Sequence, residues 1–300
     1  MSWIVLSISS AILLGFYEIA KKAALRDNAV PVVLFLHVII SATLWSPLLL
    51  ASRYASSRLP EILRVDAMST NDHLLIFAKA ILAGSSWVLA SYALKHLPMS
   101  IASPIRASSP IWTILIAVLF MGERPNAWQW CGVTVIVVSF YAFSLVGRTE
   151  GIHFHRDRWV LFMIAGTLLG ALSALYDKYL LQTMHMRAAT VQAWFSVYLT
   201  VVMLPLFINW LVRDRATIRF EWRWSIPMIA TLLLASDFIY FTAIEQPGAM
   251  ISLISPLRRT SVVIPFIVGI QFYGERNWRP KGICILCLLV GVYVLSLNKA

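Results

Sequence analysis

The chain contains 300 residues, of which 59% are hydrophobic and only 13% are charged, and its mean hydropathy is +0.76. These values lie well outside the range of soluble globular proteins and indicate an integral membrane protein. The formal net charge of +11 suits anionic headgroups of membrane lipid and does not indicate a nucleic-acid partner.

Ten apolar runs are each about as long as the ~20-residue helix that crosses a hydrocarbon core of ~30 Å. The first run follows Met1 without a basic segment, so we expect a retained helix and not a cleaved signal peptide. The sequence therefore predicts an all-α integral membrane protein with ten transmembrane helices. In chain order the runs lie near residues 3–25, 30–51, 73–94, 99–121, 128–146, 159–181, 191–211, 224–244, 250–273 and 281–297.

No residue pattern indicates a metal, a cofactor or a catalytic centre. The three cysteines, Cys131, Cys284 and Cys287, all lie in apolar runs and are expected to be small apolar fillers. His153 and His155 lack an accompanying carboxylate or cysteine pattern. The chain also has no glycine-rich nucleotide loop and no catalytic triad or HExxH motif, so we expect neither an ATP-driven pump nor an enzyme.

A duplicated segment organises the chain into two halves. Residues 103–124 read SPIRASSPIWTILIAVLFMGER, and residues 255–276 read SPLRRTSVVIPFIVGIQFYGER. These segments fall in the fourth and ninth runs, so each half has five helices. Because five is odd, the second half must enter the membrane in the opposite direction, which predicts an inverted repeat. We place the two repeats at residues 1–147 and 159–300 and the linker at residues 148–158.

Charged residues inside the apolar runs are the candidate site, because a charge at the bilayer centre costs about 2.5–3.5 kcal/mol. The basic groups outnumber the acidic ones, which predicts an electropositive chamber for an anionic substrate. Pro104 and Pro256 precede two of the arginines and are expected to kink their helices. The candidate substrate contacts are Arg258, Arg259, Lys178, Arg106 and Lys79. The candidate coupling or charge-pairing groups are Asp237, Glu18, Asp177, Lys21 and Lys22.

Internal charge pairing is the alternative explanation for these residues. Glu18 and Lys22 have the i,i+4 spacing that favours an ion pair on one helix, and Asp177 or Asp237 could neutralise an arginine. A positive excess would still remain, and an anionic substrate would account for it better than pairing alone.

The ten-span layout resembles the drug/metabolite transporter superfamily, specifically its ten-helix EamA-type permeases. The shared features are the Gly-Glu-Arg closings at residues 122–124 and 274–276 and the lysine late in the first run, Lys21 or Lys22. The resemblance covers nearly the whole chain. It implies a secondary transporter that works by alternating access, coupled to a proton or a counter-substrate.

A narrower resemblance links the ninth run to sugar-phosphate/phosphate translocators. Residues 257–263 (LRRTSVV) and the pair Asp177-Lys178 are similar to elements of that family, in which basic groups hold the substrate phosphate. Arg258 stands where those proteins have lysine, so the resemblance implies an anion more than a sugar phosphate. An arginine fork suits a carboxylate or a phosphate equally.

Two other transport functions stay open at this stage. A proton-coupled exporter of amino acids or drug-like cations would use Glu18 and Asp237 as its ligands, and a lipid-linked flippase is the third alternative. We expect a multi-pass protein of the bacterial inner membrane. The family resemblance implies cytoplasmic termini, whereas most loop Lys and Arg residues would then face outward, against the positive-inside rule.

Overall fold

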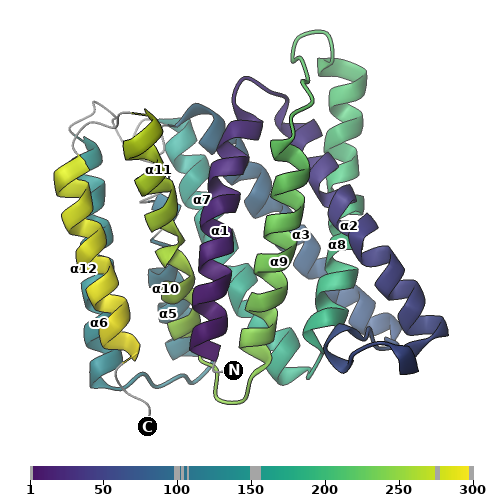
Figure 1. Ribbon diagram of the computed structural model, residues 1–300, viewed down its shortest axis with the longest axis horizontal. Helices are drawn as coiled ribbons and strands as arrows, with labels where there is room; N and C mark the ends of the chain where they lie inside the picture. The colour runs from purple at the N-terminus through teal and green to yellow at the C-terminus, as the bar shows by residue number, and fades with distance from the viewer. Residues whose placement is uncertain are drawn as a thin grey trace.

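The computed structural model describes residues 3–97, 105–106, 108–148, 157–273 and 278–296, together with Ala102. Regular structure in these ranges is helical (Figure 1). The main helices are α1 (Trp3–Leu25), α2 (Val30–Tyr54), α3 (Thr70–His96), α5 (Ser109–Phe120), α6 (Ala127–Arg148), α7 (Arg158–Lys178), α8 (Ala188–Asn209), α9 (Ser225–Glu245), α10 (Ile251–Arg259), α11 (Val263–Tyr273) and α12 (Trp278–Ser296).

Short helical turns extend or join these helices. The π-helical turns η3 (Tyr179–Thr183) and η4 (Trp210–Asp214) prolong α7 and α8, and the 3₁₀ turn η5 (Thr260–Val262) joins α10 to α11. Two further 3₁₀ turns, η1 (Ser56–Arg58) and η2 (Glu61–Leu63), lie between α2 and α3.

The helices have the length and polarity of membrane spans. Within the described ranges, seven helical stretches are long and apolar enough to cross a membrane, and three more apolar helices are shorter. The all-α membrane fold predicted from the sequence is confirmed. Local signals explain two helix starts: Ser69 and Asp72 form a capping box before α3, and Asp157 caps α7.

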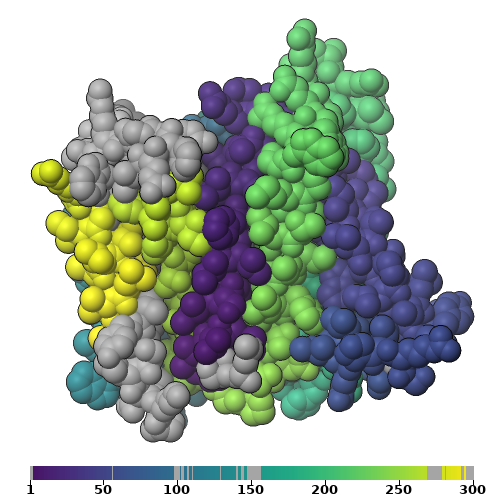
Figure 2. Space-filling view, viewed as in Figure 1, coloured from purple at the N-terminus to yellow at the C-terminus, as the bar shows by residue number. Residues whose placement is uncertain are grey.

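Successive spans run in opposite directions through the bundle (Figure 1). In this view α1 runs upward, whereas α7, which opens the second half, runs downward. The main packing pairs are α1 with α9 and α10, α2 with α8 and α9, α3 with α7 and α8, α5 with α7 and α10, and α6 with α12. Figure 2 shows α1 and α9 side by side along one face. Suppose that each of the first five spans is exchanged with the span that lies five places later in the chain. Every packing pair then becomes a pair of the same set, so the set as a whole is unchanged.

A glycine allows the close contact between α3 and α7. A side-chain carbon on Gly166 of α7 would lie 3.0 Å from the backbone nitrogen of Ala90 and 3.1 Å from the carbonyl oxygen of Ser86, both in α3. The Ser86 hydroxyl donates a hydrogen bond of 2.6 Å to the Gly166 carbonyl oxygen. Glycine at this position therefore lets α3 and α7 approach to backbone contact.

The ninth span is interrupted by a 3₁₀ turn four residues after Pro256. Pro256 lies within α10, which continues to Arg259 before η5 breaks the α-helical pattern. Its counterpart Pro104 lies outside the described residues, as do His153, His155 and residues 274–276. The break therefore follows the two arginines directly.

Candidate functional site

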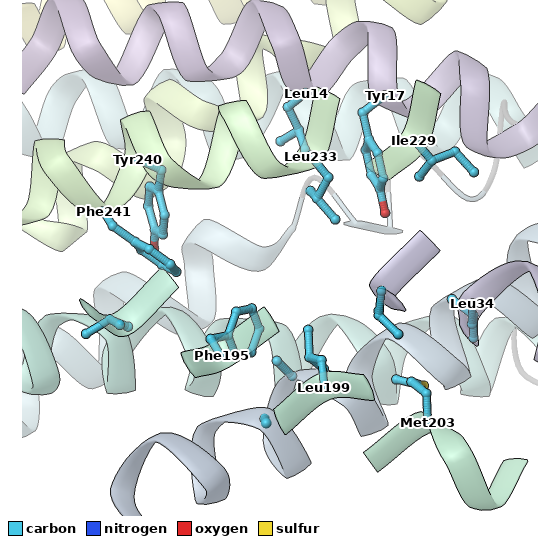
Figure 3. Close-up of a cluster of buried hydrophobic side chains, with 14 of the residues drawn as sticks. Leu14, Tyr17, Leu34, Phe195, Leu199, Met203, Ile229, Leu233, Tyr240 and Phe241 are labelled. Carbon is cyan, nitrogen blue, oxygen red and sulfur yellow. The ribbon is translucent and has the colours of Figure 1, made fainter. Parts of the chain in front are cut away.

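A cavity of about 140 Å³ lies within the helix bundle. Helices α1, α3, α7, α8, α9 and α10 contribute to its wall. In Figure 3, Leu14, Tyr17, Leu233 and Tyr240 extend from α1 and α9 toward the side on which Phe195 of α8 lies. The charged residues that line the cavity are Lys21, Lys79, Arg106, Arg258, Arg259, Asp177 and Asp237.

The helix break positions the arginines of the ninth span. Arg258 and Arg259 form the last turn of α10, where the free carbonyl groups of a helix end favour positive charge. In the first half, Arg106 lies three residues before α5 begins at Ser109. Discontinuous helices of this kind commonly line the substrate sites of transporters with internal repeats.

Three buried ion pairs join elements around the cavity. Arg106 pairs with Glu18 of α1, Lys79 of α3 pairs with Asp177 of α7, and Arg258 pairs with Asp237 of α9. The Lys79 side chain is only 2% exposed and the Asp177 side chain 6%. Each pair compensates two charges that would be costly to bury alone.

Aromatic rings surround two of the paired cations. The Lys79 ammonium lies 3.9 Å from the ring centroid of Phe195 and 4.8 Å from that of Phe241. The Arg258 guanidinium carbon lies 4.1 Å from the centroid of Tyr240. Desolvated cation–π contacts of this kind add to the stabilisation of both charges.

Two lining cations have no carboxylate partner among the described residues. Arg259 donates a hydrogen bond of 3.2 Å to the Ser109 hydroxyl. Lys21 is 4% exposed, and its ammonium lies 5.6 Å from the ring centroid of Tyr17. The cavity therefore carries more positive than negative charge.

Lys178, predicted to contact substrate, is not among the residues that line the cavity. Its ammonium donates to Glu123 Oε1 at 2.5 Å. The two Glu123 oxygens also accept hydrogen bonds from the backbone N–H groups of Ile251 (3.0 Å) and Ser252 (3.1 Å) at the start of α10. Sequence reasoning did not assign this role to Glu123, although its Gly-Glu-Arg motif marked the position.

Lys22 likewise turns away from the cavity. Its ammonium donates to the carbonyl oxygens of Leu94 (2.7 Å) and Leu97 (3.1 Å), which ties α1 to the end of α3. The expected i,i+4 pair of Glu18 with Lys22 does not form, because Glu18 instead binds Arg106. In the described part of the chain, no cluster of three His, Cys, Asp or Glu residues could hold a metal ion.

Comparisons with known proteins agree with this architecture. Residues 1–145 match the model of the EamA-like transporter family. The pseudopaline exporter CntI of Pseudomonas aeruginosa strain PAO1 is 27% identical over 215 residues, 71% of this chain and 68% of that protein. CntI of strain UCBPP-PA14 matches to the same extent.

A solved crystal structure is 13% identical in sequence and covers 98% of this chain and 96% of its own, with a TM-score of 0.65. At this identity the likeness shows the fold alone. The family match over residues 1–145, the related exporter and the helices long enough to span a membrane make this chain similar to membrane transporters of the EamA-like family.

Proposed function

We propose that this transporter moves a small organic anion, carboxylated or phosphorylated, through the central cavity by alternating access. The observation that carries the proposal is the charge of the cavity. Five cations line it, and the three acids Glu18, Asp177 and Asp237 each already pair with one of them. Two positive charges remain, on Lys21 and Arg259.

An anionic ligand would offset these two charges. Burial of uncompensated charge costs free energy, and the low dielectric of a membrane protein interior makes the cost large. A carboxylate or phosphate bound between Arg259 and Lys21 would exchange its own hydration shell for charge-assisted hydrogen bonds from these two side chains. We assign these two residues the leading role in substrate binding, with Arg258 and Arg106 at the edge of the site.

Alternating access is supported by the symmetric packing of the two halves. We propose that residues 1–147 and 159–300 are inverted repeats, since the spans alternate in direction and the packing pairs survive the exchange of halves. Transporters of this type rock one repeat against the other around a central site.

We place both termini in the cytoplasm and the protein in a bacterial inner membrane. We propose a proton or a counter-substrate as the coupling partner.

The export of amino acids or drug-like cations is the second candidate. The related protein is a pseudopaline exporter, which favours outward transport of a small metabolite. If the protein exported a cation, Glu18 and Asp237 would bind the positive group of the substrate. Both carboxylates are already bound to arginines, which favours the anion as substrate.

Ligand stabilisation of the purified protein tests the proposal. A ligand that binds only the native state stabilises it by about 2.7 kcal/mol at one hundred times its Kd. We expect di- and tricarboxylates or phosphorylated metabolites to raise the thermal midpoint, and organic cations not to. Arg259→Gln and Lys21→Met should remove this shift, whereas Arg219→Gln, at an exposed arginine outside the cavity, should retain it. Stabilisation by cations alone would refute the proposal.

A further inference from the structure

A small side pocket adjoins the central cavity. It has a volume of about 10 Å³ and shares the wall residues Trp87, Phe195, Leu233 and Asp237 with the central cavity. Its far wall contains His37 of α2 and Gln192 of α8. Because the two spaces share these residues, a ligand in the central cavity could extend one small group into the side pocket.

The side pocket contains buried polar atoms without partners. Among the described residues, the side-chain oxygen of Gln192 makes no hydrogen bond, and the His37 ring has only the backbone of Val33 and Leu34 in its own helix within reach, with no well-formed hydrogen bond to either. Each of these two residues is only 2% exposed. Buried polar groups in proteins nearly always have a partner, so three unpartnered atoms on one pocket indicate a ligand or an ordered water.

The chemistry of the wall selects the kind of group that fits. Gln192 presents a carbonyl oxygen, Asp237 a carboxylate, and a neutral imidazole has one nitrogen that accepts a hydrogen bond and one that donates. A group that mainly donates hydrogen bonds satisfies this set. The volume is about that of one water-sized probe, which fits a hydroxyl or an amine and excludes a second acidic group.

We propose that His37 and Gln192 form a specificity subsite for the hydroxyl or amino group of the transported anion. This inference rests on the proposed function, since the acidic group of the same molecule would lie against Arg259 and Lys21. The substrate class then narrows to hydroxy- or amino-substituted organic acids. An acid that lacks the substituent would leave the polar atoms of the pocket unsatisfied and would bind more weakly.

Matched ligands and matched variants test the subsite. Calorimetric titration of the purified protein would compare glutarate with 2-hydroxyglutarate and glutamate, and propyl phosphate with glycerol 3-phosphate. We expect the wild type to prefer the substituted member of at least one series by about tenfold. Gln192→Met and His37→Phe should reduce this preference to less than twofold while the affinity for the unsubstituted acid stays unchanged.

A second glutamine provides the control for both variants. The side-chain nitrogen of Gln182 donates to the carbonyl oxygens of Ile244 and Ala249, each at 2.8 Å, and Gln182 lines neither cavity. Gln182→Met should lower the thermal midpoint without changing ligand preference. Gln192→Met should raise the midpoint of the ligand-free protein, since it removes an unpartnered buried atom.

The outcomes separate the two proposals. The subsite is refuted, and the anion site stands, if the acids bind but the wild type does not prefer the hydroxy- or amino-substituted acid. The same conclusion follows if the wild type and the His37 and Gln192 variants show an equal preference. A lower midpoint for ligand-free Gln192→Met would mean that the pocket holds only a structural water, which also refutes the subsite. If no acid of either series binds, the proposed function fails, and the subsite fails with it.

Discussion

Removal of the Lys79 charge should strongly destabilise the protein, because it leaves the buried carboxylate of Asp177 without a partner. Lys79→Met keeps the apolar stem between the rings of Phe195 and Phe241 but deletes the cation bound to Asp177. The Asp177 side chain is only 6% exposed, so little water is available to replace the lost partner. Breaking a buried pair on one side costs about 3–5 kcal/mol.

The double variant Lys79→Met/Asp177→Leu should recover most of this loss. Replacing both members of a buried pair with apolar residues is often neutral or stabilising, so we expect it to lie within about 1–2 kcal/mol of the wild type. Together with the single variant Asp177→Leu these variants form a double-mutant cycle, in which the double variant should be about 1–4 kcal/mol more stable than Lys79→Met. The free energies of unfolding come from equilibrium titration of the detergent-solubilised protein with SDS.

Arg259→Met is the comparison for this cycle, because Arg259 has no described carboxylate partner to leave unpaired. We expect it to raise the free energy of unfolding of the ligand-free protein, since it removes a buried charge without a carboxylate partner, while it removes anion binding. The reasoning would be refuted if Lys79→Met were as stable as the wild type. A double variant no more stable than the single one would show that Asp177 is not the group left uncompensated.

Three further predictions follow from the packing and the topology. Gly166→Val should sharply lower the yield of folded protein in detergent chromatography, because a side chain there would meet the α3 backbone at about 3.0 Å; normal yield would contradict the contact. Glu123→Gln should lower the thermal midpoint, since Lys178 loses its charged partner, and adding Lys178→Met should restore part of the loss. Reporters fused after Gly122 and Gly274 should lie on opposite sides of the membrane, and same-side reporters would exclude the inverted repeat.

Hydrophobic run length was sufficient to predict most of the fold. A run of about 20 apolar residues has few alternatives to a membrane helix, because lipid satisfies no backbone hydrogen bond. The first predicted span, residues 3–25, coincides with α1, and most other spans differ from the helices by a few residues at their ends. The 3₁₀ break at Thr260–Val262 lies four residues after Pro256 and had no signal of its own in the sequence, because a proline removes one hydrogen bond but does not dictate where else the helix changes its pattern. The kink at Pro256 stays a prediction.

The partners of the charges were decided only by the tertiary structure. Lys178 and Arg258 both looked like substrate contacts in the sequence, yet one reaches Glu123 outside the cavity and the other lines it beside Asp237. Sequence reasoning did not single out His37 and Gln192, because each is a lone polar residue that belongs to no motif. Hydropathy depends on each residue alone and so is readable from the chain. Ion pairing and cavity lining depend on distances between helices far apart in sequence, which only their packing determines.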